Sequence, residues 1–236
     1  EDIGQIIDFH THTVLSDGKL LPAALCYEAA AKGHAAIAIT DHVDASNLEQ
    51  TLAALNQFIT DQGETLPLKV LIGVELSYDA PKLLEKYATR ARELGAQIVI
   101  VHGESPIESA VPAGTNHAAL QLKGLVDILA HPGWITEEDT ILAKVNDIFL
   151  ELTAKKGHRK GNKHVAKMAK QFGAKLIVNT DSHSEKDLIT QEEALLLAVT
   201  AGLKNGAAIK VIRDNALELL ARTTRAEKSS LLPAPN

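Results

Sequence analysis

The sequence predicts an α/β protein in which about seven parallel β/α units form a closed or nearly closed barrel. Three observations lead to this fold class. Short runs rich in Ile, Val and Leu alternate with longer segments of helical periodicity along the 236-residue chain. The runs are apolar almost without interruption, as in parallel strands that are covered on both faces. Aromatic residues make up only 3% of the chain, so we expect a core of Ala, Leu, Ile and Val.

The expected elements follow one another as a repeated module of helix, glycine and strand. Residues 81–94 show the helix well, because Pro81 suits a first helical position, apolar residues recur at spacings of three and four, and Gly95 ends the pattern. Gly33 and Gly173 precede strands in the same way. No G-x-G-x-x-G motif follows the first strand, which favours the barrel over a dinucleotide-binding sheet. The expected strands are residues 6–9, 35–40, 68–76, 97–102, 126–130, 147–152 and 175–180.

We expect a single domain at residues 1–222, because no linker or low-complexity segment divides the chain. Residues 223–236 contain Ser, Pro and Lys without a period, so they are expected to form a surface tail.

Composition restricts the partners and the location that we expect. The net charge of −6 argues against broad nucleic-acid or membrane-surface binding, since both need a positive field. Cys26 is the only cysteine, which excludes a disulfide framework and a thiolate metal site. No apolar run approaches the ~20 residues of a membrane span, and no signal-peptide pattern opens the chain. The expected location is therefore cytoplasmic, and the oligomeric state is left open.

Metal-capable side chains follow the apolar runs one after another. His10-Thr11-His12 comes after the first run, and Asp181-Ser182-His183 comes after the last. Residues two positions apart in extended chain point to the same side, so each pair would emerge together. All would gather at the C-terminal mouth of a barrel, where such barrels carry their catalytic groups. The residues are His10, His12, His42, Glu75, His102, His131, Asp181 and His183, with Asp17 joining from a loop if that loop folds back.

Taken singly, each of these residues has a structural explanation. One His at a strand end is more often a hydrogen-bonded structural residue, and Asp17 or Asp181 could cap a helix. Several buried imidazoles and carboxylates at one mouth are costly unless cations neutralise them. Nitrogen and carboxylate ligands without thiolate suit Zn, Mn or Fe rather than calcium. Nine ligands suggest two or three divalent ions.

The same residues resemble the pattern of the PHP (polymerase and histidinol phosphatase) family over residues 8–183. The motifs that carry the resemblance are His10-x-His12, Ser16-Asp17-Gly18, Thr40-Asp41-His42, Gly73-Val74-Glu75, His102, Ala130-His131-Pro132 and Asp181-Ser182-His183. The resemblance implies a distorted (β/α)7, TIM-barrel-like fold and a trinuclear metal centre. It assigns the metals to three sets of ligands: His10, His12, Glu75 and Asp181; Glu75, His102 and His131; and Asp17, His42 and His183.

A centre of this kind predicts metal-dependent phosphoester hydrolysis, in which two ions share a hydroxide that attacks a phosphate in line. No protein nucleophile is required, and Gly-x-Ser-x-Gly is absent. The compact spacing of the ligand strands favours a small phosphorylated metabolite, such as histidinol phosphate. His183 is the first candidate for the acid that protonates the leaving group and His42 the second. With Asp17 they form the expected catalytic group.

Two segments are expected to contact the substrate. Residues 155–164 are basic, and Arg159, Lys156 and Lys163 would hold a phosphate there; a solvated helix start is the alternative. His117 follows ligand His102 in a loop that could line the pocket, although helix capping explains that loop equally well.

Two further functions stay open at this point. The same centre could hydrolyse C–N bonds, as amidohydrolase barrels do, but the basic segment disfavours this. A non-catalytic module of a larger assembly is disfavoured because all nine positions are intact.

Overall fold

Parallel strands and helices alternate through the computed structural model, which describes residues 2–230, with side chains as far as residue 223. The sheet has the order β1-β2-β4-β5-β6-β7-β8, with β3 paired to β4, and every pairing is parallel. The seven expected strands are confirmed with small shifts at their ends. The strands are β1 Ile6–Thr11, β2 His34–Ile39, β3 His42–Val43, β4 Lys69–Leu76, β5 Ile98–His102, β6 Ile128–Ala130, β7 Phe149–Thr153 and β8 Leu176–Asn179.

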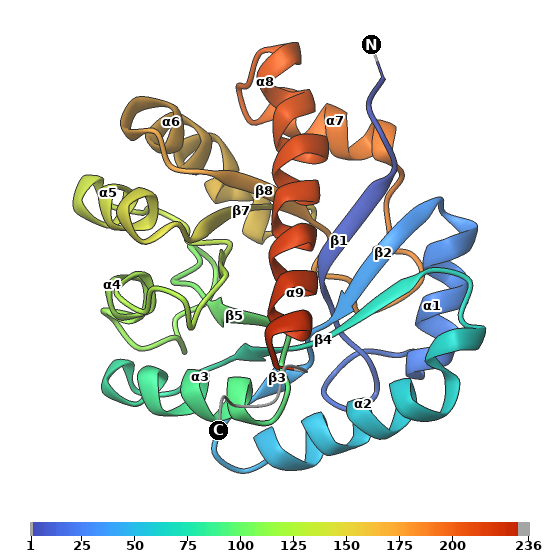
Figure 1. Cartoon of the computed structure of the whole chain (residues 1–236). Helices are drawn as coiled ribbons and strands as arrows, with labels where there is room; N and C mark the ends of the chain where they lie inside the picture. Colours follow the sequence, from blue (N-terminus) through green and yellow to red (C-terminus); the bar gives the residue numbers. More distant parts are fainter. Residues whose placement is uncertain (1, 231–236) are drawn as a thin grey trace.

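The first and last strands meet and nearly close the sheet. The backbone N–H of His12 donates to Ser182 O at 2.9 Å, and that of Lys19 donates to His183 O at 2.8 Å. Thr11 and Ser182 form a parallel bridge. Figure 1 shows the strands arranged around a common centre with helices outside them. The predicted fold class, a distorted TIM-like (β/α)7 barrel, is therefore correct.

The outer helices bury one apolar face each against the sheet. The helix expected at residues 81–94 consists of the 3₁₀ turn η2 Pro81–Leu83 and α3 Leu84–Glu93, which buries Leu84, Ala88 and Ala91. Burial in α1 raises the pKa of Cys26 to about 12, as expected for a packed thiol. The other outer helices are α1 Pro22–Ala31, α2 Leu48–Gln62, α4 Thr115–Leu120, α5 Glu137–Asn146, α6 Asn162–Phe172 and α7 Gln191–Thr200, with 3₁₀ turns η1 Gly63–Thr65 and η3 His158–Gly161.

A final helical segment closes the mouth formed by the N-terminal ends of the strands. It consists of α8 Asn205–Ile209, the π-helical turn η4 Lys210–Asn215 and α9 Ala216–Ser230, and Figure 1 shows α9 lying across the strands. Ala216 and Leu219 belong to the apolar cluster inside the barrel, together with Phe9 and Phe149. This mouth is filled by apolar side chains, so the opposite mouth is the one that carries polar groups.

The expected C-terminal tail at 223–236 is in part helical, because α9 continues to Ser230. Residues 231–236 lie outside the described residues. The division into a barrel and a tail stays a prediction.

Candidate metal centre

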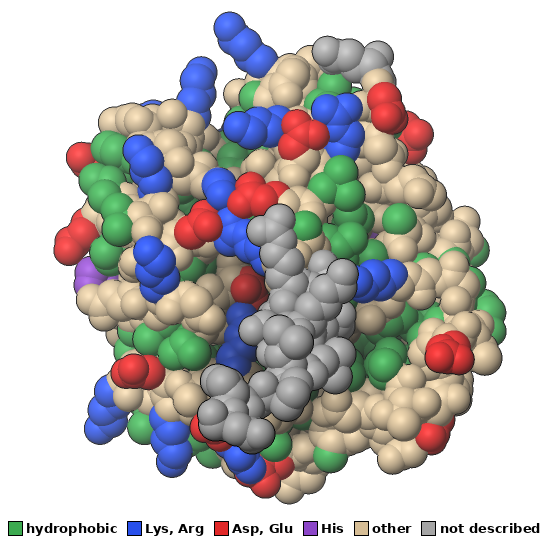
Figure 2. All heavy atoms as spheres, in the orientation of Figure 1, with side chains coloured by type: hydrophobic (Ala, Val, Ile, Leu, Met, Phe, Trp, Pro, Cys, Tyr) green, Lys and Arg blue, Asp and Glu red, His purple; other side chains and the backbone are tan. Residues whose placement is uncertain are grey.

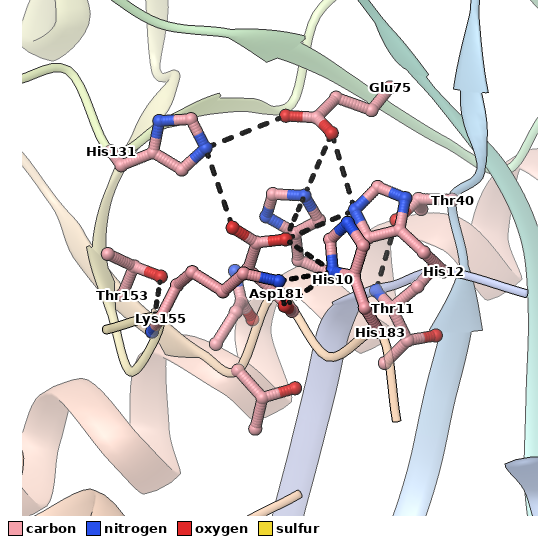
Figure 3. Close-up of polar contacts among 12 residues, drawn as sticks. His10, Thr11, His12, Thr40, Glu75, His131, Thr153, Lys155, Asp181 and His183 are labelled. Atoms are coloured by element: carbon pink, nitrogen blue, oxygen red, sulfur yellow. Dashed lines mark hydrogen bonds and ion pairs between the residues drawn. The ribbon is translucent and has the colours of Figure 1, made fainter. Parts of the chain in front are cut away.

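All nine predicted ligand side chains lie together at the C-terminal mouth of the barrel. Figure 3 shows six of them: His10, His12, Glu75, His131, Asp181 and His183. The nine side chains form groups whose candidate ligand atoms lie within 4.8 Å of one another. His12 belongs to two of these groups, and Glu75 of the third lies 3.1 Å from His10, so the groups are contiguous. They are His10, His12 and Asp181; Glu75, His102 and His131; and His12, Asp17, His42 and His183.

Glu75, from β4, lies at the middle of the centre. Its Oε2 is 3.1 Å from His10 Nε2 and 3.0 Å from His42 Nδ1, and its Oε1 is 3.8 Å from His131 Nε2. The side chain is fully buried, and neither oxygen accepts a hydrogen bond from the described residues. His10 Nε2 is likewise buried without a hydrogen-bond partner among the described residues, and its nearest charged groups are the carboxylates of Glu75 and Asp181. Buried polar atoms of this kind are costly unless a cation joins them, so the donor set fits bound metal.

Two histidines of the centre are held neutral at pH 7. Burial outweighs the attraction of Asp181 and lowers the pKa of His12 to about 4. Burial and the charge of His102 lower the pKa of His131 well below its usual range. A neutral imidazole is the form that binds a metal. These two side chains are therefore ready to bind without losing a proton.

His10 shows the opposite effect. Burial lowers its pKa, but the carboxylates of Glu75, Glu151 and Asp181 outweigh burial and raise that pKa well above its usual range. The three carboxylates thus create a negative field at His10 Nε2. A divalent cation bound beside His10 would neutralise the negative charge of these carboxylates.

Asp17 occupies the most open corner of the centre. Its side chain is 58% exposed, and its Oδ1 is 3.1 Å from His183 Nε2 and 3.8 Å from His42 Nε2. Asp41 brings the loop into place, because its carboxylate accepts hydrogen bonds from Thr13 N at 2.7 Å and Ser16 Oγ at 2.6 Å. Burial raises the pKa of Asp17, but His183 and His42 outweigh it and lower the value to about 2.

A cleft of about 330 Å³ opens beside Asp17 and His42, with Ser46 and Tyr78 in its wall. It gives solvent and small ligands a way to this corner of the centre.

Two of the nine residues have unusual backbone. His131 has φ of 28° and Asp181 has φ of 54°, in the left-handed region that side chains other than glycine rarely adopt. Such a conformation costs about 1–3 kcal/mol and persists where the surroundings hold it. Glu151 is one of those surroundings, since its Oε2 accepts a hydrogen bond from His131 N at 3.0 Å.

Three residues of the site were not expected from the sequence. Glu151, in the middle of β7, has Oε1 2.8 Å from His10 Nδ1. This contact orients His10 Nε2 toward the centre. The sequence did contain a signal that this strand carries a further site residue, because the expected strand at residues 147–152 supplied none of the nine predicted metal ligands. Lys155 Nζ lies 2.6 Å from His183 Nδ1, and His158 stacks on His131 with ring centroids 4.2 Å apart.

The expected substrate-binding residues lie elsewhere. Arg159 donates to Ala154 O at 2.7 Å and lines a groove beside α6 together with Lys163. Lys156 is exposed, and His117 Nδ1 lies 2.7 Å from Asp139 Oδ1, between α4 and α5. Among the described residues, none of the four forms a hydrogen bond or ion pair with the nine. The segment after β7 therefore places Lys155 and His158 at the centre, and Arg159 and Lys163 in the groove beside α6.

Comparison with known proteins places the chain in a family. A model of the PHP domain matches residues 8–206. The chain belongs to the PHP domain family. An uncharacterized protein of Methanocaldococcus jannaschii is 44% identical over 219 residues, which cover 91% of this PHP chain and 98% of the relative.

Two other similar proteins are connected with ribonuclease P. The Ribonuclease P protein component 3 of Methanosarcina barkeri is 28% identical over 221 residues, covering 87% of this PHP chain and 84% of the relative. A chain in the cryo-EM structure of archaeal Ribonuclease P with mature tRNA aligns with a TM-score of 0.71 at 16% identity, covering 97% and 96% of the two chains.

These relatives overturn the expectation that the chain has no broad nucleic-acid binding. That expectation rested on the net charge of −6. It is wrong because the similar proteins include a Ribonuclease P protein component and a chain from a structure of Ribonuclease P with mature tRNA. A net charge sums over the whole surface and does not exclude a local basic region. In the described part of the chain, no helix is long and apolar enough to cross a membrane. The cytoplasmic location stays a prediction.

Proposed function

We propose that this PHP protein is a metal-dependent phosphoesterase that hydrolyses a small phosphorylated metabolite, with histidinol phosphate or a similar phosphomonoester as the first candidate. The observation that carries the proposal is Glu75, a fully buried carboxylate whose two oxygens face imidazoles and accept no hydrogen bond from the described residues. The ions proposed for this centre are two or three of Zn, Mn or Fe.

The nine side chains would hold these ions in the three sets given above, with Glu75 shared between two of them. Bound there, the metals would activate water and offset the charge of a phosphate group. Lys155 adds a cation of the chain itself, because its Nζ lies beside His183 Nδ1 and donates to Asp181 O at 3.2 Å. We therefore assign the phosphate-facing charge to Lys155 rather than to Arg159, Lys156 or Lys163.

Asp17, His42 and His183 remain the proposed catalytic group at the open corner. His183 Nε2 lies 3.1 Å from Oδ1 of Asp17, whose pKa is lowered to about 2. A leaving group entering by the cleft beside His42 would meet these residues first.

The test is a phosphatase screen on purified protein, with p-nitrophenyl phosphate and a metabolite panel that includes histidinol phosphate, nucleotides and amide substrates. We expect phosphate release that a chelator abolishes, and a loss of orders of magnitude in His102→Ala with the fold retained. Turnover of amides alone would favour the C–N hydrolase alternative. Normal turnover by metal-stripped protein would refute both.

We infer, as a second function, that the protein binds RNA. Two grooves of about 440 and 550 Å³ run along α6, one toward α7 and one toward α8 and η4. Figure 2 shows Lys and Arg side chains gathered over α6 and α8. Seven basic residues line these two basic grooves against two carboxylates, Glu193 and Glu218: they are Arg159, Lys160, Lys163, Lys170, Lys175, Lys204 and Lys210.

An RNA backbone suits these grooves because phosphates are bound mainly by such charges, without aromatic side chains for base stacking. The relationship to a ribonuclease P component supports RNA as the polyanion. Fluorescence anisotropy with a labelled RNA hairpin should show binding that weakens as salt rises. The variant Lys170→Glu/Lys204→Glu/Lys210→Glu should bind at least about tenfold more weakly.

The matched control is Lys82→Glu/Lys86→Glu on the α3 side, where Glu49, Glu85 and Glu93 already balance the basic residues. It should bind RNA like the unchanged protein. Equal loss in both variants would place RNA elsewhere, and absence of binding by the unchanged protein would exclude this second function without touching the first.

A further inference from the structure

His158 lies at the edge of the candidate metal centre although it is not among the nine residues. It begins η3 after β7, and its ring stacks on that of His131 at a centroid distance of 4.2 Å and an interplanar angle of 25°. Its ring centroid is 6.1 Å from that of His102. A candidate ligand atom of His158 lies within 4.8 Å of those of His131 and Asp181. A further imidazole therefore stands against His131 and Asp181.

The hydrogen-bonding of His158 matches that of two of the predicted ligands, His10 and His42. Metal-binding histidines usually donate one ring N–H to an oxygen, which fixes the ring and leaves the other nitrogen for the metal. In this centre Nδ1 meets an oxygen in His10, where Glu151 is 2.8 Å away, and in His42, where Ser77 Oγ is 2.7 Å away. His158 Nδ1 lies 2.5 Å from Ser105 Oγ. Its Nε2 is therefore the ring nitrogen that is available to bind a metal.

Neighbouring loops hold His158 in this position. Gly157 has φ of 102°, and a Cβ on it would lie 2.7 Å from Ile107 Cδ1 in the loop after β5. A Cβ on Gly161 would lie 3.0 Å from Gly133 Cα in the loop after β6. Ser105 itself is only 6% exposed. The loops after β6 and β7 thus pack closely where Gly161 meets the backbone of Gly133. This packing and the buried Ser105 fix the position of His158.

We propose that His158 is a further protein ligand, through its Nε2, of the metal held by His131, beside which Asp181 also lies. This inference rests on the metal centre of the proposed function. Glu75, His102 and His131 alone supply three protein ligands, the number typical of catalytic zinc sites, and Glu75 is shared with a second ion. His158 gives the ion a fourth protein ligand and raises its affinity. Ser105 is a positioning residue, because it acts only through the His158 ring.

The experiment measures metal content and affinity rather than turnover. His158→Ala protein is loaded with Zn²⁺ or Mn²⁺, its bound metal is counted by elemental analysis, and the affinity of each ion is obtained by competition with a chromophoric chelator. We expect one ion to bind about 10- to 100-fold more weakly, as is usual when a contact at a metal site is lost. Ser105→Ala should weaken the same ion by a smaller factor. The visible spectrum of the Co²⁺-loaded protein should change in His158→Ala.

His117→Ala is the matched control. Its Nδ1 also meets an oxygen, that of Asp139, but it lies between α4 and α5, so metal content and the Co²⁺ spectrum should not change. His158→Asn is the second variant if His158→Ala does not fold, with folding judged by circular dichroism of metal-free protein.

Unchanged affinity and an unchanged Co²⁺ spectrum in folded His158 variants would overturn the inference and leave the phosphoesterase proposal standing. A rise in KM without loss of metal would overturn it too, and would assign His158 to substrate contact. If the unchanged protein binds no transition metal, the proposed function fails first.

Discussion

Glu151 is a single side chain that organises both flanks of the candidate centre. It is fully buried, meets His10 Nδ1 at 2.8 Å, and accepts hydrogen bonds from Asn179 Nδ2 at 2.9 Å and His131 N at 3.0 Å. One carboxylate therefore orients the ring of His10 and the strained backbone of His131. Its position inside an apolar strand explains why sequence reasoning passed over it.

Glu151→Gln should lower the affinity for metal about 10- to 100-fold while the protein stays folded, because an amide of the same shape lacks the charge that orients His10. Chelator competition on the Zn²⁺-loaded protein measures this. Glu64→Gln, at an exposed site in η1, serves as the control. Full metal affinity in Glu151→Gln would show that His10 needs no support from β7.

Asp79 makes the stability depend on pH outside the metal centre. Burial and the charge of Asp44 raise the pKa of Asp79 to about 6, and its Oδ2 is buried without a partner among the described residues. A carboxyl whose pKa is raised on folding favours the folded state below its unfolded pKa of about 4, and loses this contribution as pH rises through 6.

Asp79→Asn should therefore stabilise the protein at pH 7.5 by about 1 kcal/mol, a figure reduced for partial exposure, and by nothing at pH 4. Urea unfolding at the two pH values measures the difference. The exposed Asp61→Asn should be neutral at both. A gain for Asp79→Asn that is equal at pH 4 and 7.5 would exclude titration as its cause.

At the scale of elements, the strands and their order could be predicted because their signals are local. Each is a short apolar run with a glycine or a polar residue at its ends, as for Gly173 before β8. The position of α9, which fills one mouth of the barrel, could not be predicted, because Ala216 and Leu219 look like the buried face of any outer helix. Which surface a helix covers depends on tertiary packing, which periodicity does not encode.

Leu219→Ala tests whether α9 fills the mouth of the barrel. Leu219 is fully buried against the inside of the barrel, so truncation should cost about 2–5 kcal/mol of unfolding free energy. Leu217 lies on the same helix and is 53% exposed; Leu217→Ala should change stability by less than about 0.5 kcal/mol. Urea unfolding compares the two. Equal losses would mean that α9 does not fill the barrel mouth.

For the whole molecule, the convergence of the nine side chains could be predicted, while the paths of the loops between them could not. Strand ends fix residues such as His12 and Glu75, and parallel strands bring those ends to one mouth. The turn after β7 decides that Lys155 faces His183 while Arg159 lies in a groove along α6. Net charge failed as a guide to nucleic acid for a related reason, since it carries no information on where charges lie.

The metal centre should also contribute to the stability of the whole fold. In the buried mouth, the carboxylate of Glu75 lies beside His10 and that of Asp181 lies beside His12. Without cations, burying these charged groups opposes folding. Metal that binds only the folded chain adds about 2.7 kcal/mol at a hundredfold excess over its Kd. Because protons compete with metal for imidazoles and carboxylates, this stabilisation should be larger at pH 7.5 than at pH 5.5.

Thermal unfolding of chelator-treated and Zn²⁺- or Mn²⁺-loaded protein at both pH values measures this contribution. Glu75→Gln should lose most of the shift, because it removes the charge that two ions would share, whereas Glu138→Gln on the outer face of α5 should keep it. Identical unfolding temperatures with and without metal would mean that protons alone satisfy the buried groups. In that case the barrel would support its mouth without ions, and the centre could not be the site of metal chemistry.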